Sequence, residues 1–501
     1  MDPTRRSVTL GSLLVPTLAY GQGPAGDDDL SALGACAAAS LIRDGSLSAE
    51  RYATALIARQ RRLAMLNVAI SFDEALVLEQ ARGVDLARKR GAVLGPLAGL
   101  PFVVKDQIDA VGYPTTAGTP ALRDYRPARD GSVVAAMRRA RAVLFAKANM
   151  HELAGGGTSS NPTFGFVRNP YDPSRSPGGS SGGTAAAIAA RIVPIGLGED
   201  TGGSVRIPAG FCGIAGLRPS SWPAKLYPDD GMVPPPTPDD TQTIGPMARS
   251  VADVALLHAA ITGRAVLTVP ALAKVRIGIP SAAFWDDPRI DQGVARVTRI
   301  AFDRLAAAGA TLVEIDLDRM LRLGADLAAV VPTGNRDRFA AWLADTMPGV
   351  TLASLAAQIA SRDVRAAYAR PATAPAFSAE RQAALRADAN RQYAEIIRVA
   401  GVDALAFPNP LIPAPLIAPQ GDPEEPMVEV AGRAWPLRDV ALRYEMFGSR
   451  LGVPGLNMPI DEAGGLPVGL ELEGVPGGDE RLLALGMAVE GLFDPLPPPR
   501  L

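Results

Sequence analysis

Two glycine- and serine-rich segments lie close together in this sequence: Ser176-Pro177-Gly178-Gly179-Ser180-Ser181-Gly182-Gly183-Thr184 and Gly196-Leu197-Gly198-Glu199-Asp200-Thr201-Gly202-Gly203-Ser204-Val205-Arg206-Ile207-Pro208. An alanine-rich run over 185–190, predicted to be helical, separates them. Glycines beside serines permit tight turns and let a ligand approach backbone N–H groups closely. Consecutive N–H groups from Thr201 to Ser204 can form a concave nest of the kind that binds an oxyanion. A serine in each of the two loops argues against a flexible linker.

Neither segment has the spacing of a nucleotide-binding loop. The chain lacks a Gly-x-x-x-x-Gly-Lys-Ser/Thr pattern, and it lacks a Gly-x-Gly-x-x-Gly pattern followed by an acidic residue. The serines are therefore better candidates for nucleophilic chemistry than for phosphate binding.

The composition restricts which base could activate such a serine. The chain has 501 residues, 48% of them hydrophobic and 20% charged, and a formal net charge of −2. This balance gives no whole-chain electrostatic reason to bind nucleic acid or an anionic membrane. The only histidines are His151 and His258, and the only cysteines are Cys36 and Cys212, which we expect to be separate buried thiols. Their spacing matches no metal motif, so the sequence points away from histidine and zinc chemistry.

A lysine kept neutral by burial is a recognised alternative to histidine as the base. Lys105 ends the apolar run Leu100-Pro101-Phe102-Val103-Val104, which has the character of a buried strand. Burial there would disfavour the ammonium form and lower the lysine pKa. A lysine after a strand is more often a surface residue, and it is the pairing with the two glycine–serine loops that makes Lys105 the candidate base.

Helical and strand-like segments alternate along the chain. Helices are predicted at 132–141, 293–308 and 382–400, and each is followed by a strand, at 142–146, 311–315 and 402–407, the last ended by Pro408. Such alternation predicts an α/β fold, with a sheet covered by helices on both faces. Two Pro-rich stretches, 222–240 and 408–426, are predicted to be long irregular loops.

The first residues resemble an export signal. Arg5-Arg6 precedes a short apolar run through Leu18 that Pro16 interrupts and that is too short to span a bilayer. We expect residues 1–26 to be a twin-arginine signal that directs the protein to the periplasm or the medium, and residues 27–501 to be the folded domain. The alternative is a tail whose arginine pair occurs by chance, which would leave the protein in the cytoplasm.

The combined motifs resemble those of the amidase signature family. The resemblance rests on the two glycine–serine loops, on Gly99 to Asp106, on Gly465 to Leu470 and on Asp479 to Leu483, and it spans roughly residues 30–495, with the signature core at about 95–220. It implies a single large α/β/α domain around a mixed β-sheet and a Ser-cisSer-Lys triad.

The resemblance also assigns roles to residues. It makes Ser204 the nucleophile, Ser180 the cis-serine after a cis Gly179–Ser180 peptide, and Lys105 the base. It gives the oxyanion-binding role to Thr201, Gly202, Gly203 and Ser204, and a substrate-facing carbonyl to Ala154. Ser181, Asp200 and Arg206 are expected to support the site, His151 to be a loop residue beside it and His258 a helix residue. The implied acyl-enzyme mechanism needs no metal and no organic cofactor.

Within the family, the segments around Met150 to Gly165 and Thr201 to Ala209 are most similar to mandelamide and indoleacetamide hydrolases. We therefore expect a small apolar or aryl carboxamide as substrate. Apolar residues of the two Pro-rich loops are the candidate pocket wall: Trp222, Leu226, Tyr227, Met232, Leu411 and Ile412. Alternatively, these loops pack on the surface or form a contact in a homodimer.

Two other functions remain open at this point. One is the glutaminase subunit of a tRNA-dependent amidotransferase, which would work in the cytosol with partner subunits. The other is an inactive binding protein on the same scaffold. The leader argues against the first, and the intact set of three triad residues argues against the second.

Overall fold

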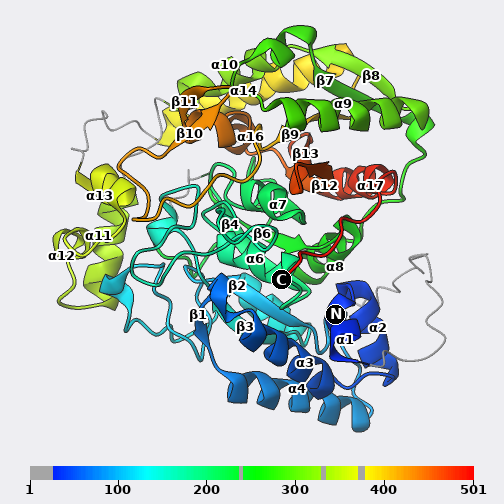
Figure 1. Cartoon of the computed structure of the whole chain (residues 1–501). Helices are drawn as coiled ribbons and strands as arrows, with labels where there is room; N and C mark the ends of the chain where they lie inside the picture. Colours follow the sequence, from blue (N-terminus) through cyan, green and yellow to red (C-terminus); the bar gives the residue numbers. More distant parts are fainter. Residues whose placement is uncertain (1–25, 236–240, 329–334, 370–378) are drawn as a thin grey trace, which may run out of the picture.

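The computed structural model describes residues 26–235, 241–328, 335–369 and 379–501. In these residues eleven strands form one mixed sheet (Figure 1), in the order β1 (Ala69–Phe72), β3 (Val143–Ala148), β2 (Pro101–Lys105), β4 (Ile195–Asp200), β6 (Thr243–Ala248), β5 (Ala215–Arg218), β12 (Gly455–Ala463), β13 (Leu466–Glu473), β9 (Ala404–Asn409), β7 (Arg276–Pro280) and β8 (Thr311–Ile315). Strand β2 pairs parallel with β3 and β4, and β7 pairs parallel with β8 and β9. All pairs from β4 through β6, β5, β12 and β13 to β9 are antiparallel. A separate hairpin joins β10 (Met427–Val430) and β11 (Arg433–Pro436).

Helices cover both faces of this sheet. They are α1 (Asp27–Ala32), α2 (Ala35–Asp44), α3 (Ala49–Arg62), α4 (Glu74–Lys89), α5 (Ser132–Arg139), α6 (Gly182–Ala189), α7 (Arg206–Cys212), α8 (Val251–Thr262), α9 (Gln292–Ala307), α10 (Leu317–Ala328), α11 (Asn335–Thr346), α12 (Leu352–Ala356), α13 (Arg362–Ala369), α14 (Ala379–Ala400), α15 (Arg438–Ala441), α16 (Glu445–Leu451) and α17 (Asp479–Glu490). Strand β12 shows the layering, because successive side chains of a strand point to opposite faces. A Cβ on Gly455 would face Arg206 of α7, whereas the next residue, Leu456, contacts Gly486 of α17. The predicted α/β/α arrangement around a mixed sheet is confirmed.

Polar side chains begin several of these helices. Ser48 accepts a hydrogen bond from the third residue of α3, and Asp73 and Ser250 do the same for α4 and α8. Asp291 accepts from two backbone amides of α9. Such caps satisfy N–H groups that have no partner inside the helix.

Most predicted elements are found close to their expected positions. The helices predicted at 132–141, 293–308 and 382–400 are α5, α9 and α14, and the strand predicted at 311–315 is β8. The prediction that Pro408 ends a strand was wrong, because β9 runs on to Asn409. The ladder between β9 and β7 covers only Ala404 and Leu405, so one side of β9 has no partner strand at Pro408, where a residue without an N–H is tolerated.

Helix α6 brings one glycine–serine loop onto the sheet. All eight of its residues, Gly182–Ala189, are buried. A Cβ on Gly183 would lie 2.2 Å from the carbonyl oxygen of Asn149, so only glycine permits this approach. The small side chains of the run that separates the two serine loops therefore set how closely those loops approach the ends of β2 and β4.

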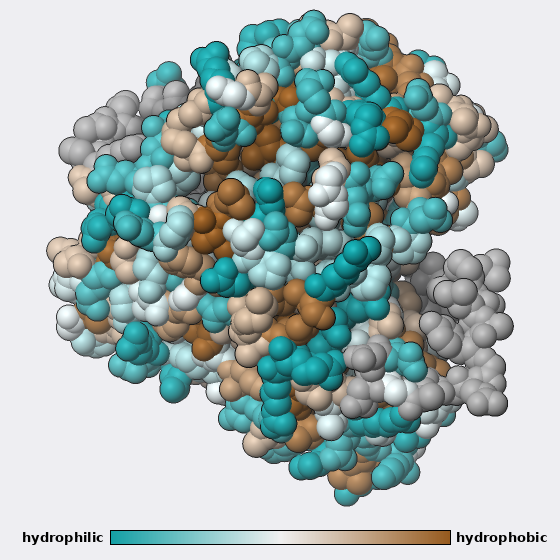
Figure 2. All heavy atoms as spheres, viewed as in Figure 1, coloured by the Kyte–Doolittle hydropathy of each residue, from teal (hydrophilic) through white to brown (hydrophobic). Residues whose placement is uncertain are grey.

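The structure also bears on the predicted thiols and on the predicted leader and loop segments. Both cysteines are free thiols, Cys212 buried and Cys36 half-buried. No helix among the described residues is long and apolar enough to cross a membrane. Hydrophilic and hydrophobic side chains are mixed over the face seen in Figure 2. The twin-arginine segment and the part of the first Pro-rich loop at 236–240 lie outside the described residues.

Candidate active site

Lys105 and the second glycine–serine loop meet at the carboxyl ends of two neighbouring strands of the sheet. Strands β2 and β4 are parallel neighbours, so their carboxyl ends lie side by side, and Lys105 ends β2 just as Glu199 and Asp200 end β4. The Lys105 side chain is fully buried, and its Nζ lies 2.7 Å from Ser180 Oγ and 2.7 Å from Glu199 Oε2. The predicted base and the predicted cis-serine are therefore in direct hydrogen-bond contact.

Burial of Lys105 disfavours the charged form of its amine. Burial lowers the pKa of Lys105 below its ordinary value, and the nearby carboxylates of Glu199 and Asp200 oppose this by raising it. The net direction is downward. A lysine with a lowered pKa can accept a proton from a serine hydroxyl near neutral pH.

Ser180 follows a cis peptide bond with Gly179, as expected from the resemblance. Its carbonyl oxygen accepts hydrogen bonds from the His151 N–H at 3.1 Å and from the Ser159 hydroxyl at 3.3 Å. A Cβ on Gly179 would lie 2.7 Å from the backbone nitrogen of Thr158, so the chain passes too close there for any other residue. These contacts fix the backbone that carries the Ser180 hydroxyl.

Ser204 lies half-buried between β4 and α7. The carboxylate of Asp200 accepts hydrogen bonds from the Gly203 N–H at 2.7 Å and from the Val205 N–H at 3.1 Å, and so shapes the loop on both sides of Ser204. The Ser204 carbonyl accepts from the Ser181 N–H, which joins the two serine loops. In the described part of the chain the Ser204 hydroxyl makes no hydrogen bond to Ser180. Catalytic hydrogen bonds of this kind are often formed only in the complex with substrate.

The Asp200 contacts correct one detail of the expected oxyanion site. The Gly203 N–H already donates to Asp200, so it is not available to a ligand. This leaves the amides of Thr201, Gly202 and Ser204 as candidate donors. The residue patterns alone did not predict this use of Asp200.

Ala154 lies in the short 3-10 turn η3 (Glu152–Ala154) and has a positive φ of 55°, like Leu153 before it at 51°. The Ala154 N–H donates to the His151 carbonyl, and Leu153 is held by the carbonyl of Ala117. Ala154 is half-buried, beside the loop that supports Ser180. The substrate-facing role of its carbonyl stays a prediction.

A buried ionic cluster supports the Ser204 loop from behind. The fully buried Arg206 guanidinium contacts Asp200, Glu445, Glu471 and Glu473, at 3.1, 2.7, 3.2 and 3.2 Å. Burial raises the pKa of Asp200, but Arg206 and Arg218 lower it by more, and the net value is about 2. Burial also raises the pKa of Glu471, to about 7, and that of Glu445 and Glu473 well above the ordinary range. Asp200 therefore has the lowest pKa of the four carboxyl groups in the cluster.

His151 belongs to a second buried cluster. Its Nε2 lies 3.0 Å from Asp363 Oδ2 at the start of α13, and its Nδ1 lies 3.3 Å from the Thr158 hydroxyl, which also bonds Asp422. Among the described residues His151, Asp363 and Asp422 are close enough to hold a metal ion, with ligand atoms within 4.8 Å of one another. Burial lowers the pKa of His151, but Asp363, Asp422 and Glu152 outweigh it and raise the pKa. Both ring nitrogens of His151 already face polar partners. We therefore interpret this cluster as an ion pair that joins the loop of His151 to α13.

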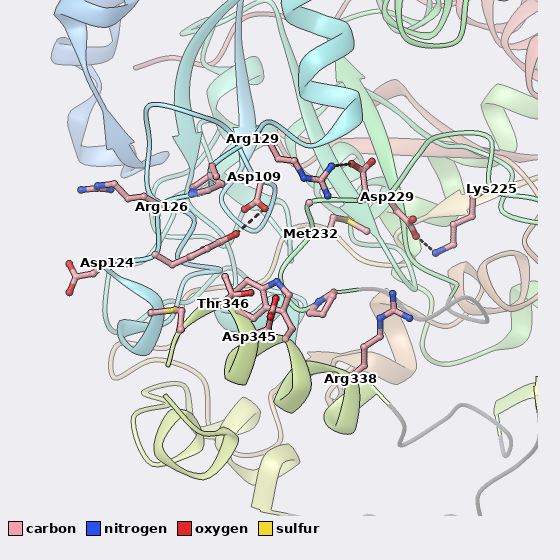
Figure 3. A pocket seen from close by; sticks show the side chains of 18 residues that line it. Asp109, Asp124, Arg126, Arg129, Lys225, Asp229, Met232, Arg338, Asp345 and Thr346 are labelled. Carbon is pink, nitrogen blue, oxygen red and sulfur yellow. Dashed lines mark hydrogen bonds and ion pairs between the residues drawn. The ribbon is translucent and has the colours of Figure 1, made fainter. Parts of the chain in front are cut away.

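A cavity of about 1160 Å³ lies beside the loop that follows Lys105. Figure 3 shows its lining of mixed charge, which includes Asp109, Arg129, Lys225 and Arg338. None of the three predicted triad residues lines it. We therefore interpret it as a cavity separate from the reacting groups.

In their described residues, 222–235 and 408–426, the two Pro-rich loops do not form a shared apolar wall. Tyr227 packs in the main core, and Leu411 and Ile412 pack in a second core around α16. Trp222 is half-buried and stacks with Arg386, and Leu226 packs on the edge of the main core. Met232 is the member of the predicted set that lines the charged cavity.

Apolar side chains from another region lie closer to the serine loops. A Cβ on Gly157, which packs against Gly179, would face Leu442 at 3.5 Å and Leu437 at 3.7 Å. A Cβ on Gly202 would lie 2.4 Å from Met446 Sδ. Leu437, Leu442 and Met446, on and beside α15 and α16, therefore lie close to the Gly157–Gly179 contact and to the Ser204 loop. Their distance in sequence from the motifs left no signal that could have revealed this.

A buried lysine bonded to one serine, with a second serine at a glycine-rich turn, is typical of serine hydrolases that use lysine in place of histidine. The amidase family model matches residues 53–483. Mandelamide hydrolase of Pseudomonas putida is 32% identical over 486 residues, which cover 92% of each chain. Indoleacetamide hydrolase of Agrobacterium vitis is 35% identical over 447 residues, 87% of this chain and 91% of that protein.

Further similarities agree with this result. One subunit of the glutamyl-tRNA(Gln) amidotransferase of Salinispora arenicola (strain CNS-205) is 32% identical, with 94% of this chain and all of that protein covered. The crystal structure of an amidase superposes with a TM-score of 0.79 at 31% identity over 92% of this chain and all of that chain. The chain belongs to the amidase signature family, whose members hydrolyse amide C–N bonds.

Proposed function

We propose that this protein hydrolyses a small apolar or aryl carboxamide to the acid and ammonia, through an acyl-enzyme on Ser204. The observation that carries the proposal is the 2.7 Å contact between the buried Lys105 Nζ and Ser180 Oγ, next to the loop that holds Ser204. In this contact Lys105 is placed to accept the serine proton, a role that histidine has in many other serine hydrolases.

The proposed reaction begins with neutral Lys105. Lys105 takes the Ser180 proton while Ser180 takes the Ser204 proton, and Ser204 Oγ attacks the amide carbon. The backbone amides of Thr201, Gly202 and Ser204 stabilise the oxyanion, a contribution of about 3–4 kcal/mol for a well-placed donor. The proton returns through Ser180 to the leaving nitrogen, and water then hydrolyses the acyl-enzyme.

The apolar side chains near the serine loops support an apolar acyl group. Leu437, Leu442 and Met446 offer no partner to a charged substrate, and a charge stranded there would be costly to desolvate. The similarity to mandelamide and indoleacetamide hydrolases points to the same substrate class.

A glutaminase component of an amidotransferase is the second candidate, favoured by the similarity to the Salinispora arenicola protein. Specificity constants for phenylacetamide, hexanamide and glutamine, measured as ammonia release by the purified chain alone, separate the candidates. We expect phenylacetamide and hexanamide to be hydrolysed well and glutamine poorly. A clear preference for glutamine would favour the amidotransferase function, and no ammonia from any amide would favour a binding protein.

We also propose that residues 1–26 export the protein through the twin-arginine route, on the basis of Arg5-Arg6 and the short apolar run that follows. Replacing both arginines by lysine should leave the protein in the cytoplasm, as measured by fractionation of the producing cells. Normal export of that variant would contradict the proposal.

A further inference from the structure

Glu199 is a buried carboxylate to which neither the motifs nor the proposed reaction gives a role. It is the penultimate residue of β4, and its side chain is 1% exposed. One carboxylate oxygen lies 2.7 Å from Lys105 Nζ, and the other accepts a hydrogen bond from the Thr201 hydroxyl at 2.6 Å. Glu199 therefore connects the proposed base to the first residue of the proposed oxyanion loop.

The main chain of Glu199 is held as firmly as its side chain. Its N–H donates to Ser181 Oγ at 3.2 Å, and its carbonyl accepts from the Ser181 hydroxyl at 3.2 Å. The same carbonyl lies 3.3 Å from Lys105 Nζ. Both groups of Glu199 that face Lys105 are thus fixed by neighbours in the two serine loops.

The contacts of Lys105 match the charged form of its amine. An ammonium has three N–H donors, and three acceptors surround Nζ: Ser180 Oγ, Glu199 Oε2 and the Glu199 carbonyl. A buried ammonium without such partners would be strongly disfavoured. The site therefore provides for the ammonium that Lys105 becomes on accepting a proton, whereas burial favours the neutral amine from which the reaction starts.

We propose that Glu199 is a positioning residue for Lys105: its carboxylate holds Nζ against Ser180 and stabilises the ammonium that forms each time Lys105 accepts the Ser180 proton. This inference rests on the proposed function. Thr201 holds the carboxylate in place and couples it to the oxyanion loop.

The proton balance needs no further reactant. The Ser204 O–H bond breaks and its proton goes to Ser180 Oγ, while the Ser180 proton forms a new N–H bond on Lys105. No proton passes to or from Glu199 in these steps. When the C–N bond breaks, Lys105 returns a proton to Ser180, and Ser180 gives one to the leaving nitrogen.

Replacing Glu199 by a neutral residue tests this role through the pH profile. The Glu199 carboxylate raises the pKa of Lys105 against the effect of burial, so its loss lowers that pKa further. In Glu199→Gln the acid limb of kcat/KM for phenylacetamide should move to lower pH by about one unit or more, and kcat on the plateau should fall about tenfold or more because the base is weaker. KM should change little, because the Glu199 carboxylate is buried and its oxygens contact Lys105 and Thr201. Glu199→Asp keeps the charge and should leave the limb near its wild-type position.

The matched control is Glu490→Gln at the end of α17, where a half-buried carboxylate accepts the Val251 N–H. It should keep the wild-type pH profile. If Glu199→Gln does not fold, Glu199→Thr provides a second neutral residue, one suited to a strand.

The rate at which a fluorophosphonate modifies Ser204 is measured against pH in the same variants and does not depend on the amide chosen. A shift of the acid limb in the pH dependence of this modification rate supports the inference even if phenylacetamide is a poor substrate. A neutral variant that loses rate but keeps the wild-type limb would overturn the role of Glu199 and leave the proposed function standing. Wild-type protein that is not modified at Ser204 would overturn both.

Discussion

At the scale of single residues, the site depends on three hydroxyls that differ in their neighbours. Ser180 Oγ contacts Lys105 Nζ, whereas Ser181 Oγ bonds the backbone of Glu199. The Ser204 hydroxyl lies on the half-buried turn that Asp200 shapes. These environments predict three different costs of removing a hydroxyl.

Ser204→Ala should abolish turnover of phenylacetamide, and Ser180→Ala and Lys105→Ala should each lower kcat by about 10³-fold or more, because each removes a member of one proton-transfer unit. Ser181→Ala should mainly lower the free energy of unfolding, by about 1 kcal/mol, because it loses hydrogen bonds to the main chain. Steady-state kinetics and thermal unfolding of the four variants check this. Full activity of Ser204→Ala, or an equal loss in Ser181→Ala and Ser180→Ala, would contradict these assignments.

The pKa of Lys105 sets the expected pH dependence. Burial lowers that pKa below the ordinary value, and the base is active only when neutral. Activity should therefore fall as the pH drops through the lowered pKa and stay high into the alkaline range. A profile of kcat/KM against pH measures this, and a maximum in the acid range would exclude a lysine base.

At the scale of elements, the group of helices α11 to α13 docks on the turn that carries Ala154. Figure 1 shows these helices together at the left edge of the molecule. Phe339 and Leu355 of this group share a small core with Leu153. The Glu152 carboxylate accepts the Ala360 and Ser361 N–H groups, which adds polar contacts to the apolar ones.

Gly156 gives a direct test of this docking. A Cβ there would lie 2.3 Å from His151 Cε1 and 2.8 Å from Asp363 Oδ2, so Gly156→Ala should separate the ion pair between His151 and α13. We expect a loss of about 1–3 kcal/mol in stability, a higher KM for phenylacetamide and faster proteolysis within residues 335–369. Gly83→Ala in α4, where a Cβ meets nothing within 4 Å, is the control and should match or exceed wild-type stability. Unchanged KM and proteolysis in Gly156→Ala would show that the docking does not affect the site.

The elements also show what the sequence could predict and what it could not. Helices such as α9 and α14 are long and periodic, and the glycines around Ser180 and Ser204 restrict the backbone, so both could be predicted locally. The course of β9 through Pro408 depends on where the neighbouring ladder ends, which no local pattern records. Tyr227 and Leu411 are apolar residues of the kind that can line a pocket, but both lie in hydrophobic cores. Hydrophobicity alone does not distinguish a residue that lines a pocket from one that packs in a core.

At the scale of the whole molecule, Arg206 joins parts of the chain that are far apart in sequence. Its partners Glu445, Glu471 and Glu473 follow it by more than 200 residues, on α16 and β13. The sequence could suggest a supporting role for Arg206 and Asp200 beside Ser204. It could not suggest these three partners or the contact of Glu199 with Lys105, because single glutamates at such distances have no characteristic spacing.

Removing Arg206 should therefore destabilise the entire fold. Arg206→Met removes the cation that contacts Asp200, Glu445, Glu471 and Glu473, and breaking buried pairs of this kind costs about 3–5 kcal/mol. Thermal unfolding at pH 5 and pH 8 measures this. The exposed pair of Arg398 and Glu395 provides the control, Arg398→Gln, which should leave the midpoint unchanged. A wild-type midpoint in Arg206→Met would contradict the role of the cluster.

The same cluster predicts how stability varies with pH. Burial raises the folded-state pKa of Glu471 from 4.5 to about 7, so the folded protein binds this proton more tightly than the unfolded chain. The contribution is fully present below the unfolded pKa and is lost as the pH rises through 7, by about 3 kcal/mol. Glu471→Gln should therefore flatten the fall in thermal midpoint between pH 5 and pH 8. An equal fall in that variant and in wild type would contradict the shift.

The most direct test of the central claim is the site of covalent modification by a fluorophosphonate, mapped by intact-protein and peptide mass spectrometry. The proposed mechanism predicts a single adduct on Ser204, its loss in Ser204→Ala, and much slower formation in Lys105→Ala with the fold intact by thermal unfolding. An adduct on another residue, or equally fast labelling of Ser204 without Lys105, would contradict a Ser204 nucleophile activated by Lys105 through Ser180.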